Sequence, residues 1–156
     1  MDPVFVKLNV KQEAELLVLR APVSFGPALD TLGEIRVRER VVDARPIAFA
    51  LIFCTTQEQV DAAAAAVASQ MAPDGKLWFA YPKQSSKRLR CDFNRDTGWS
   101  ALGAHGFEGV RQISIDEDWT ALRFRRATAI KTLRRAPSRA LSAEGRARVK
   151  AAAKKK

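Results

Sequence analysis

The sequence predicts an α/β domain whose sheet is mostly parallel, with flanking helices and an antiparallel hairpin at its end. Residues 47–54 form an uninterrupted apolar run, a stretch with helical spacing of apolar residues follows, and residues 76–81 form a second apolar run. A strand, a helix and a strand in this order, within about 35 residues, are typical of a right-handed parallel βαβ unit. The hairpin is predicted by two alternating runs, residues 110–115 and 119–124, around the acidic turn at residues 116–118.

Several elements are expected before this unit. Residues 4–8 alternate weakly and predict an edge strand, whereas residues 15–20 form a continuous apolar run that predicts a buried strand. A short helix is expected over residues 25–32, because Ser24 is a candidate cap, a proline follows in the first turn and a glycine stands just beyond the end. Residues 34–42 alternate between branched apolar and charged side chains, which fits a half-exposed strand.

The strongest helical signal begins at Thr56, which can form a capping box with Gln59. Apolar residues then recur at helical spacing as far as Met71. A second, short helix is expected after Asp96, which stands where a helix cap would stand. The three tryptophans fall on predicted strands or on the apolar face of this helix, so we expect them to pack in the core: Trp78, Trp99 and Trp119.

The net charge of +10 is concentrated at the C-terminal end of the sequence. Residues 127–156 hold ten of the 27 lysines and arginines but one of the 17 acidic residues, so they carry a net +9 and residues 1–126 carry +1. Apolar positions are too sparse in this segment to offset the entropy lost on ordering. We therefore expect a folded domain over residues 1–126 and a basic Ala/Lys/Arg-rich tail over residues 127–156 that is disordered or transiently helical.

The tail predicts a polyanionic partner. Ten cations close together in sequence can displace counterions from nucleic acid without reading its sequence. The candidate nucleic-acid-binding residues are Arg134, Arg135, Arg139, Arg146, Arg148, Lys150, Lys154, Lys155 and Lys156.

Composition excludes or disfavours other classes of protein. No apolar run is long enough to span a bilayer, and the first residues lack the pattern of a signal peptide, so we expect a cytoplasmic protein with no membrane partner. The single histidine, His105, and the two cysteines, Cys54 and Cys91, stand in no zinc-ligand spacing, so we predict no metal site and no disulfide. A strand near the N-terminus at the edge of the sheet leaves dimerisation open.

The candidate ligand site is the polar loop that leaves the strand at residues 76–81. In open α/β sheets, ligands bind beyond the carboxyl ends of the strands. Lys83 and Lys87 can act there as point charges, and the hydroxyls of Ser85 and Ser86 can donate hydrogen bonds to a phosphate or a carboxylate. The competing interpretation is a solvated, mobile surface loop.

Two carboxylates near this loop complete the candidate set. Asp96 precedes the short helix and Glu117 stands in the hairpin turn, and together they can frame a cleft. The favoured explanation of Asp96 is the capping of the short helix. No nucleophile stands at a motif spacing from His105, so no catalytic residue is assigned.

Three segments within residues 15–126 match a known family: Val18–Pro22, Leu77–Ser86 and Asp116–Phe124. Together they resemble an uncharacterised bacterial family, a domain of unknown function with a truncated methyltransferase-like core. It implies a Rossmann-like, doubly wound sheet whose last two strands form an antiparallel hairpin, as in the S-adenosylmethionine-dependent methyltransferases.

The turn after the first buried strand departs from the pattern that a methyltransferase uses to bind its cofactor. A glycine-rich turn lets the backbone approach the cofactor closely. Residues 20–26 hold one late glycine and a proline instead, and residues 38–40, Arg-Glu-Arg, close the second strand, where Glu39 is the one residue able to reach a ribose. We therefore expect no cofactor.

Two functions of different classes remain open. The favoured one is a non-catalytic interaction module whose basic tail contacts nucleic acid or another polyanion. The alternative is a small-ligand-binding or vestigial methyltransferase-like enzyme domain that uses the loop after residues 76–81. A cavity that joins Lys83, Ser85, Asp96 and Glu117 would favour the alternative.

Overall fold

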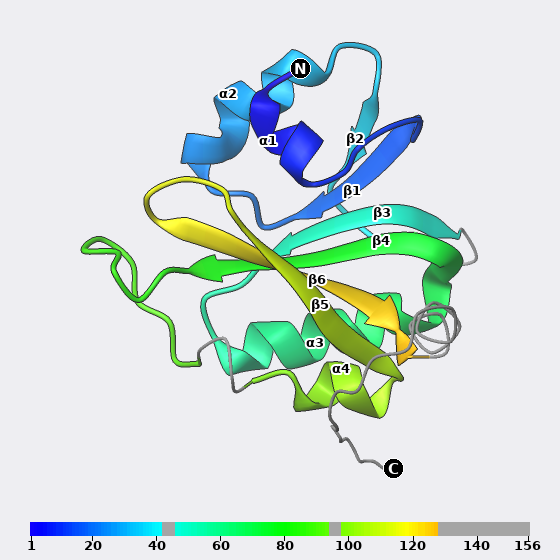
Figure 1. Cartoon of the computed structure of the whole chain (residues 1–156), viewed down its shortest axis with the longest axis vertical. Helices are drawn as coiled ribbons and strands as arrows, with labels where there is room; N and C mark the ends of the chain where they lie inside the picture. The colour runs from blue at the N-terminus through cyan, green and yellow to red at the C-terminus, as the bar shows by residue number, and fades with distance from the viewer. Residues whose placement is uncertain (42–45, 94–97, 128–156) are drawn as a thin grey trace, which may run out of the picture. The chain divides into compact units, whose positions relative to one another are not determined.

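The computed structural model describes residues 1–41, 46–93 and 98–127. Within these residues the chain forms one six-stranded sheet with the strand order β2-β1-β3-β4-β6-β5 (Figure 1). The strands are β1 Glu15–Leu19, β2 Arg36–Arg38, β3 Ile47–Phe53, β4 Met71–Pro82, β5 Phe107–Ser114 and β6 Trp119–Arg126. The helices are α1 Pro3–Lys7, α2 Gly26–Leu29, α3 Gln57–Val67 and α4 Ser100–Ala104.

The sheet is parallel through its first four strands and antiparallel at its end. β1 pairs in parallel with β2 and with β3, and β3 pairs in parallel with β4. β6 runs antiparallel to both β4 and β5. The predicted α/β class, the β3–α3–β4 unit and the terminal hairpin are therefore confirmed.

Helices cover both faces of the sheet, with α1 and α2 over one face and α3 and α4 over the other (Figure 1). Alternate residues of the central strands feed the two cores: Phe49 and Leu51 of β3 face α1 and α2, whereas Ala50 and Ile52 face α3. Because both faces are covered, β3 is apolar along nearly its whole length. None of the described helices is long and apolar enough to cross a membrane.

The predicted edge strand at residues 4–8 is wrong, because these residues belong to α1. The Asp2 carboxylate accepts a 2.9 Å hydrogen bond from the Val4 amide, and a proline occupies the first turn. Val4, Phe5 and Leu8 are buried, which is the i, i+1, i+4 spacing of one helix face. Over so short a segment this spacing also resembles the alternation of a strand.

The helix predicted at residues 25–32 is divided. A 3₁₀ turn at Val23–Phe25, α2 and a second 3₁₀ turn at Asp30–Leu32 follow one another, and no side chain caps the first turn, so the expected cap at Ser24 is wrong. The next strand, β2, is shorter than predicted, although residues 42–45 lie outside the described residues.

The capping box at the start of α3 is confirmed in part. The Thr56 hydroxyl accepts a 3.2 Å hydrogen bond from the Gln59 amide, but the Gln59 side chain reaches back to the amide of Thr55, at 2.7 Å, instead of that of Thr56. After α3, strand β4 begins at Met71, earlier than predicted, and its pairing with β3 shifts register between Ile47 and Phe49.

The tryptophans pack in the core as predicted. Trp78 is fully buried and Trp119 is nearly so, and Trp99 packs partly buried against the core on the α3 side. Asp96 lies outside the described residues, and the short helix it was expected to cap begins at Ser100.

Candidate ligand-binding site

A cavity of about 930 Å³ opens beside the loop that leaves β4, at the carboxyl end of the parallel strands. This volume lies within the range of small-molecule sites, roughly 300 to 1,000 Å³. The cavity is lined by the end of β4, by the loop and by two residues of β5 and β6: Tyr81, Pro82, Lys83, Gln84, Ser85, Ser86, Leu89, Arg90, Cys91, Asp92, Phe93, Gln112 and Thr120.

One wall of the cavity is a chain of hydrogen-bonding groups on the sheet. The Gln112 amide nitrogen donates to the Thr120 hydroxyl at 3.0 Å and, at 3.5 Å, to the Tyr81 hydroxyl. The Thr120 hydroxyl in turn donates to the carbonyl of Ile113 at 2.9 Å. These bonds fix the orientation of the Gln112 amide, so its carbonyl oxygen is held in position at the cavity wall.

A second wall is aromatic. The rings of Tyr81 and Phe93 lie 5.7 Å apart, and Trp99 packs edge-on against both, at 5.5 and 5.2 Å. Edge-to-face packing of this kind holds each ring in one orientation. The two rings that line the cavity therefore form a rigid apolar surface.

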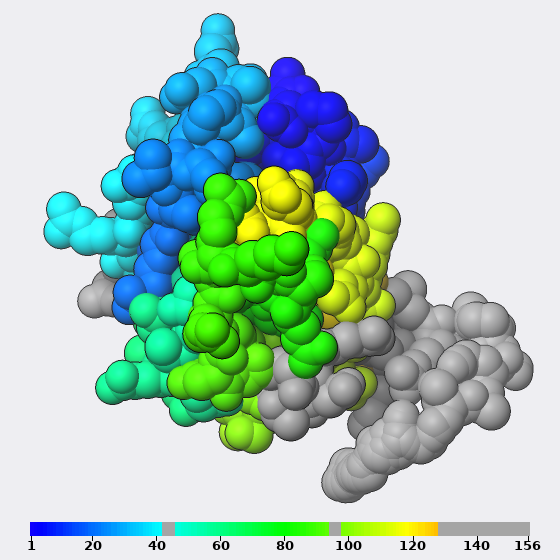
Figure 2. Space-filling view, turned by 90° about the vertical axis from the view of Figure 1, so that its left-hand side faces the viewer, coloured from blue at the N-terminus to red at the C-terminus, as the bar shows by residue number. Residues whose placement is uncertain are grey.

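The loop after β4 is tied to the turn between β5 and β6, beside which it lies in Figure 2. The Asp118 carboxylate accepts hydrogen bonds from the Ser86 hydroxyl at 2.9 Å and from the Arg88 guanidinium at 2.6 Å. The Lys83 amide donates to the Asp118 carbonyl at 2.8 Å. The two segments therefore form one continuous rim.

These bonds set the charge of the rim. The hydrogen bond from Ser86, followed by that from Arg88, holds the pKa of Asp118 below its usual range. Asp118 in turn raises the pKa of the Arg88 guanidinium. Both groups are charged at neutral pH and neutralise one another, so neither contributes net charge to the rim.

The far end of the loop is tied to α3. The Asp92 carboxylate accepts a 2.7 Å hydrogen bond from the Gln57 amide in the first turn of α3, where an anion also suits the helix dipole. The Asp92 amide donates to the carbonyl of Thr55 at 3.3 Å. The loop is therefore anchored at both ends by hydrogen bonds, while most of its side chains are exposed to solvent, as the solvated-loop interpretation expects.

The charges left at the cavity are cationic. Lys83 and Arg90 line it, and the one carboxylate of the lining, Asp92, is engaged by the backbone of α3. Lys83 donates a 2.7 Å hydrogen bond to the Ser114 hydroxyl and belongs to none of the described ion pairs, although its charge also acts on the nearby Asp118 carboxylate. The site therefore suits an anion.

The structure brings together three of the six residues proposed from sequence. Lys83, Ser85 and Ser86 line the cavity, although the Ser86 hydroxyl is already used to anchor the loop. Lys87 and Glu117 are exposed and lie outside the lining, and Glu117 stands 3.7 Å from Arg88. Asp96 lies outside the described residues.

Sequence reasoning missed the wall contributed by the hairpin. Gln112 and Thr120 lie on the α3 side of β5 and β6, and their positions follow from the register in which Ser114 pairs with Thr120. The alternation of the two strands was visible in the sequence, but the hairpin's place beside β4 was not.

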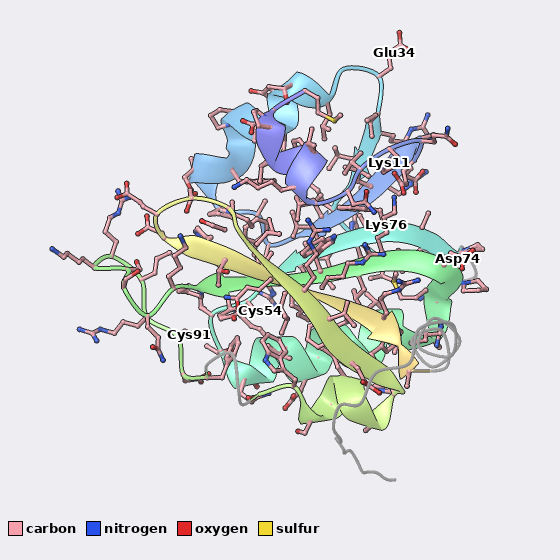
Figure 3. All side chains as sticks on the ribbon, in the orientation of Figure 1. Lys11, Glu34, Cys54, Asp74, Lys76 and Cys91 are labelled. Carbon is pink, nitrogen blue, oxygen red and sulfur yellow. The ribbon has the colours of Figure 1, made fainter. Side chains whose placement is uncertain are left out.

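The cysteines are unsuited to act as nucleophiles. Both are free, and they lie at the same end of the sheet (Figure 3). Burial raises the pKa of Cys54 to about 12 and also raises that of Cys91, which lines the cavity. Both thiols are therefore protonated at neutral pH. Among the described residues, no three potential metal ligands lie together.

The turn after β1 is not the glycine-rich turn that binds a cofactor, and it leads into a cluster of packed aromatic rings. Arg20 adopts a left-handed conformation, with φ of 61°, which glycine would adopt at no steric cost. Beyond it, the ring of Phe25 packs 5.1 Å from that of Phe53, which packs 5.0 Å from that of Trp119. No residue of this turn lines the cavity, so the cavity and the turn are separate places on the same edge.

The fold is that of the S-adenosylmethionine-dependent methyltransferases. A methyltransferase of Aquifex aeolicus superposes with a TM-score of 0.55 at 12% identity, over 79% of this chain and 88% of that chain. The N-methyltransferase NodS of Bradyrhizobium japonicum gives 0.51 at 15%, over 79% and 92%, and DhpI in complex with S-adenosylhomocysteine gives 0.53 at 10%, over 80% and 83%. No family model matches the sequence, and no curated protein shows significant similarity to it.

These comparisons confirm the resemblance for the core. The Rossmann-like, methyltransferase-like sheet is present, whereas identities of this size carry no information on activity. Membership of the uncharacterised bacterial family stays a prediction.

Proposed function

We propose that residues 1–126 form a ligand-binding domain of vestigial methyltransferase type, which holds a small anionic molecule in the cavity after β4. The observation that carries this proposal is the cavity itself, in which rigid aromatic rings, a fixed polar wall and two cations outside the described ion pairs converge. The methyltransferase fold supports this function over a purely non-catalytic tether, because open α/β sheets bind ligands at this edge.

The lining defines the chemical class of the ligand. Tyr81 and Phe93, whose rings are tilted by 43° to one another, offer an apolar surface to an unsaturated or aromatic ring. Arg90 and Lys83 offer charge to a carboxylate or a phosphate. An aromatic carboxylate or a nucleoside monophosphate combines these two features.

A thermal-shift screen of the full chain tests this. The panel contains aromatic carboxylates, nucleoside monophosphates and S-adenosylmethionine. A ligand at about 100 times its Kd stabilises the folded state by about 2.7 kcal/mol, which raises Tm by several degrees in a domain of this size.

Matched variants locate the site. Arg90→Gln removes a cation from the lining, and Lys87→Gln removes one from the same loop outside the lining. We expect Arg90→Gln to abolish most of the shift and Lys87→Gln to preserve it. A shift from S-adenosylmethionine that survives Arg90→Gln would instead place a ligand at the turn after β1 and contradict the proposal.

The proposal assigns binding and no catalytic step. The only histidine, His105, is exposed at the end of α4 and does not line the cavity. Cys91 lines it as a protonated thiol. No cofactor enters the proposal.

A second function is favoured by the charge of residues 127–156, which lie almost entirely outside the described residues. We propose that this tail holds a nucleic acid through its phosphates, in a protein that works in the cytoplasm. If about half of its ten cations touched phosphates, log K would fall with log salt at a slope of about −4.

Anisotropy titrations at several salt concentrations test the tail. The variant replaces the nine candidate tail residues, from Arg134 to Lys156, by glutamine in the otherwise intact chain. We expect the steep salt dependence to be lost, while ligand shifts in the cavity remain. Equal slopes for the variant and the wild type would refute a role for the tail.

A further inference from the structure

Three arginines project from one face of the β5–β6 hairpin. In the antiparallel register, Arg111 lies directly opposite Arg123. Arg125 follows two positions further along β6, so its side chain projects from the same face. Leu122 and Phe124, the neighbours of Arg123 on either side, point into the core beneath α3. The arginines therefore lie on the opposite side of the sheet from the ligand cavity, and we call them the arginine patch.

This arrangement is unfavourable for the folded domain alone. Like charges that face one another across an antiparallel pair destabilise it. Burial, and then the charges of Arg125 and Arg111, hold the pKa of Arg123 below its usual range. Glu108 lies opposite Arg125 without forming an ion pair. The charge of Glu13 raises the pKa of Arg123, against the other causes, but this carboxylate is itself bound to Lys76 at 2.7 Å. Among the described residues, no carboxylate pairs with the arginine patch.

The guanidinium of Arg123 is held in place by the core, and one of its N–H donors has no acceptor. Its guanidinium carbon lies 6.0 Å from the centre of the Trp78 ring, an indole that is fully buried. Its Nε is buried and has no hydrogen-bond partner. The buried Nε itself is out of a ligand's reach, so the attraction for an oxyanion comes from the guanidinium charge, which is held in place with two further cations beside it.

We propose that the arginine patch binds the phosphodiester backbone of a nucleic acid. The three cations stand on two successive positions of an open sheet face, about 7 Å apart along the strand. That spread suits an anion with repeated charges better than a single phosphate, which enclosed and converging donors bind. The patch is therefore matched to a phosphodiester chain by its own three charges.

The inference concerns the folded domain and is separate from both proposed functions. It needs neither an occupied cavity nor a contact made by the tail. The variant with nine tail residues replaced by glutamine tests binding by the tail, and substitutions on the hairpin test binding by the patch. Either proposal can therefore be refuted without the other.

The test uses the full chain and a fluorescently labelled single-stranded oligonucleotide. Arg111→Gln removes one charge from the patch, and Arg36→Gln removes one from an exposed position on β2, which forms no ion pair in the described residues. We expect Arg111→Gln to weaken binding several-fold at low salt and to reduce the salt slope by about 0.7, the value for one phosphate contact on a single strand. Arg36→Gln is expected to leave both unchanged.

Stability provides the second readout. Since Arg111→Gln relieves the repulsion with Arg123, its Tm should equal or exceed that of the wild type, so weaker binding cannot arise from unfolding. If Tm falls instead, Arg125→Gln takes its place with the same expectation for the slope. An equal loss of oligonucleotide affinity in Arg111→Gln and Arg36→Gln would overturn the proposal. A second result would also overturn it: inorganic phosphate raises the Tm of the wild type but not that of Arg111→Gln, while both proteins bind the oligonucleotide equally well. That result would indicate a site for a single phosphate.

Discussion

The hydroxyl of Ser86 donates a 2.9 Å hydrogen bond to the carboxylate of Asp118, a residue in the turn between β5 and β6. The same hydroxyl accepts hydrogen bonds from the amides of Leu89, at 3.1 Å, and Arg88, at 3.3 Å. One side chain thus shapes the loop after β4 and attaches it to the hairpin. The rim of the ligand cavity depends on this attachment.

Ser86→Ala should loosen the loop without unfolding the domain. The variant leaves the Leu89 amide without its acceptor, so we expect the amide hydrogen of Leu89 to exchange about tenfold faster, since 1.4 kcal/mol of local stability corresponds to a factor of ten. Hydrogen exchange followed by mass spectrometry measures this. Ser85→Ala is the control, because Ser85 lines the same cavity but forms no hydrogen bond in the described residues. Equal exchange in the two variants would show that Ser86 does not anchor the loop.

The Asp118 carboxylate should make stability depend on pH. Its pKa in the folded protein is held below the usual value near 3.8, so its contribution is complete above that pH and is lost as pH falls through the lowered value. Asp118→Asn lacks this contribution. We expect its Tm to lie below that of the wild type at neutral pH and the difference to shrink below about pH 4.

The control for this prediction is Asp74→Asn, which removes the same charge from an exposed position on β4. Its Tm should differ little from that of the wild type at neutral pH. If the difference in Tm between Asp118→Asn and the wild type stays constant down to pH 2, the charge of the carboxylate is not the cause of that difference.

Two glycines should respond in opposite directions to alanine. A Cβ at Gly75 would lie 2.7 Å from the Ile47 carbonyl oxygen, a backbone atom at the register shift between β3 and β4, so Gly75→Ala should destabilise the domain by about 1–3 kcal/mol. A Cβ at Gly103, in α4, meets nothing within 4 Å, so Gly103→Ala should stabilise by about 0.5–1 kcal/mol. Urea denaturation measures both. If Gly75→Ala leaves the free energy of unfolding unchanged, the two strands can move apart at this position at little cost.

The thiols should alkylate slowly. With a pKa of about 12 against the usual 9.0, Cys54 holds about a thousandfold less thiolate than a free cysteine at neutral pH. Cys91 is less buried, so iodoacetamide should modify it first, at a rate that rises with pH above 9. Mass spectrometry of the intact chain and of its peptides gives the order. Because Cys91 lines the cavity, a bound ligand should slow its modification further. Rapid labelling of Cys54 would contradict its burial in the core just beyond the end of β3.

The strands and the long helix could be predicted from sequence because their signals are local. The apolar run of β3 and the capping residue Thr56 each lie within a few neighbouring positions, and burial on both sheet faces demands that run. The short elements could not be predicted in this way. α1 has only five residues, so the spacing of Val4, Phe5 and Leu8 resembles a strand as much as a helix.

The sequence by itself also determined where charge accumulates, since the +9 of residues 127–156 is a matter of composition. Only the tertiary structure decided which residues share a site. Ser86 meets Asp118 and Gln112 meets Tyr81 across about thirty positions of chain, because β6 inserts between β4 and β5. Arg111 faces Arg123 for a related reason, the register of a hairpin with an irregularity beside Gly109. Within the hairpin, the register is set by the alternation of the strands and by the turn. The place of the hairpin beside β4 depends on the packing of the whole sheet, which no local pattern encodes.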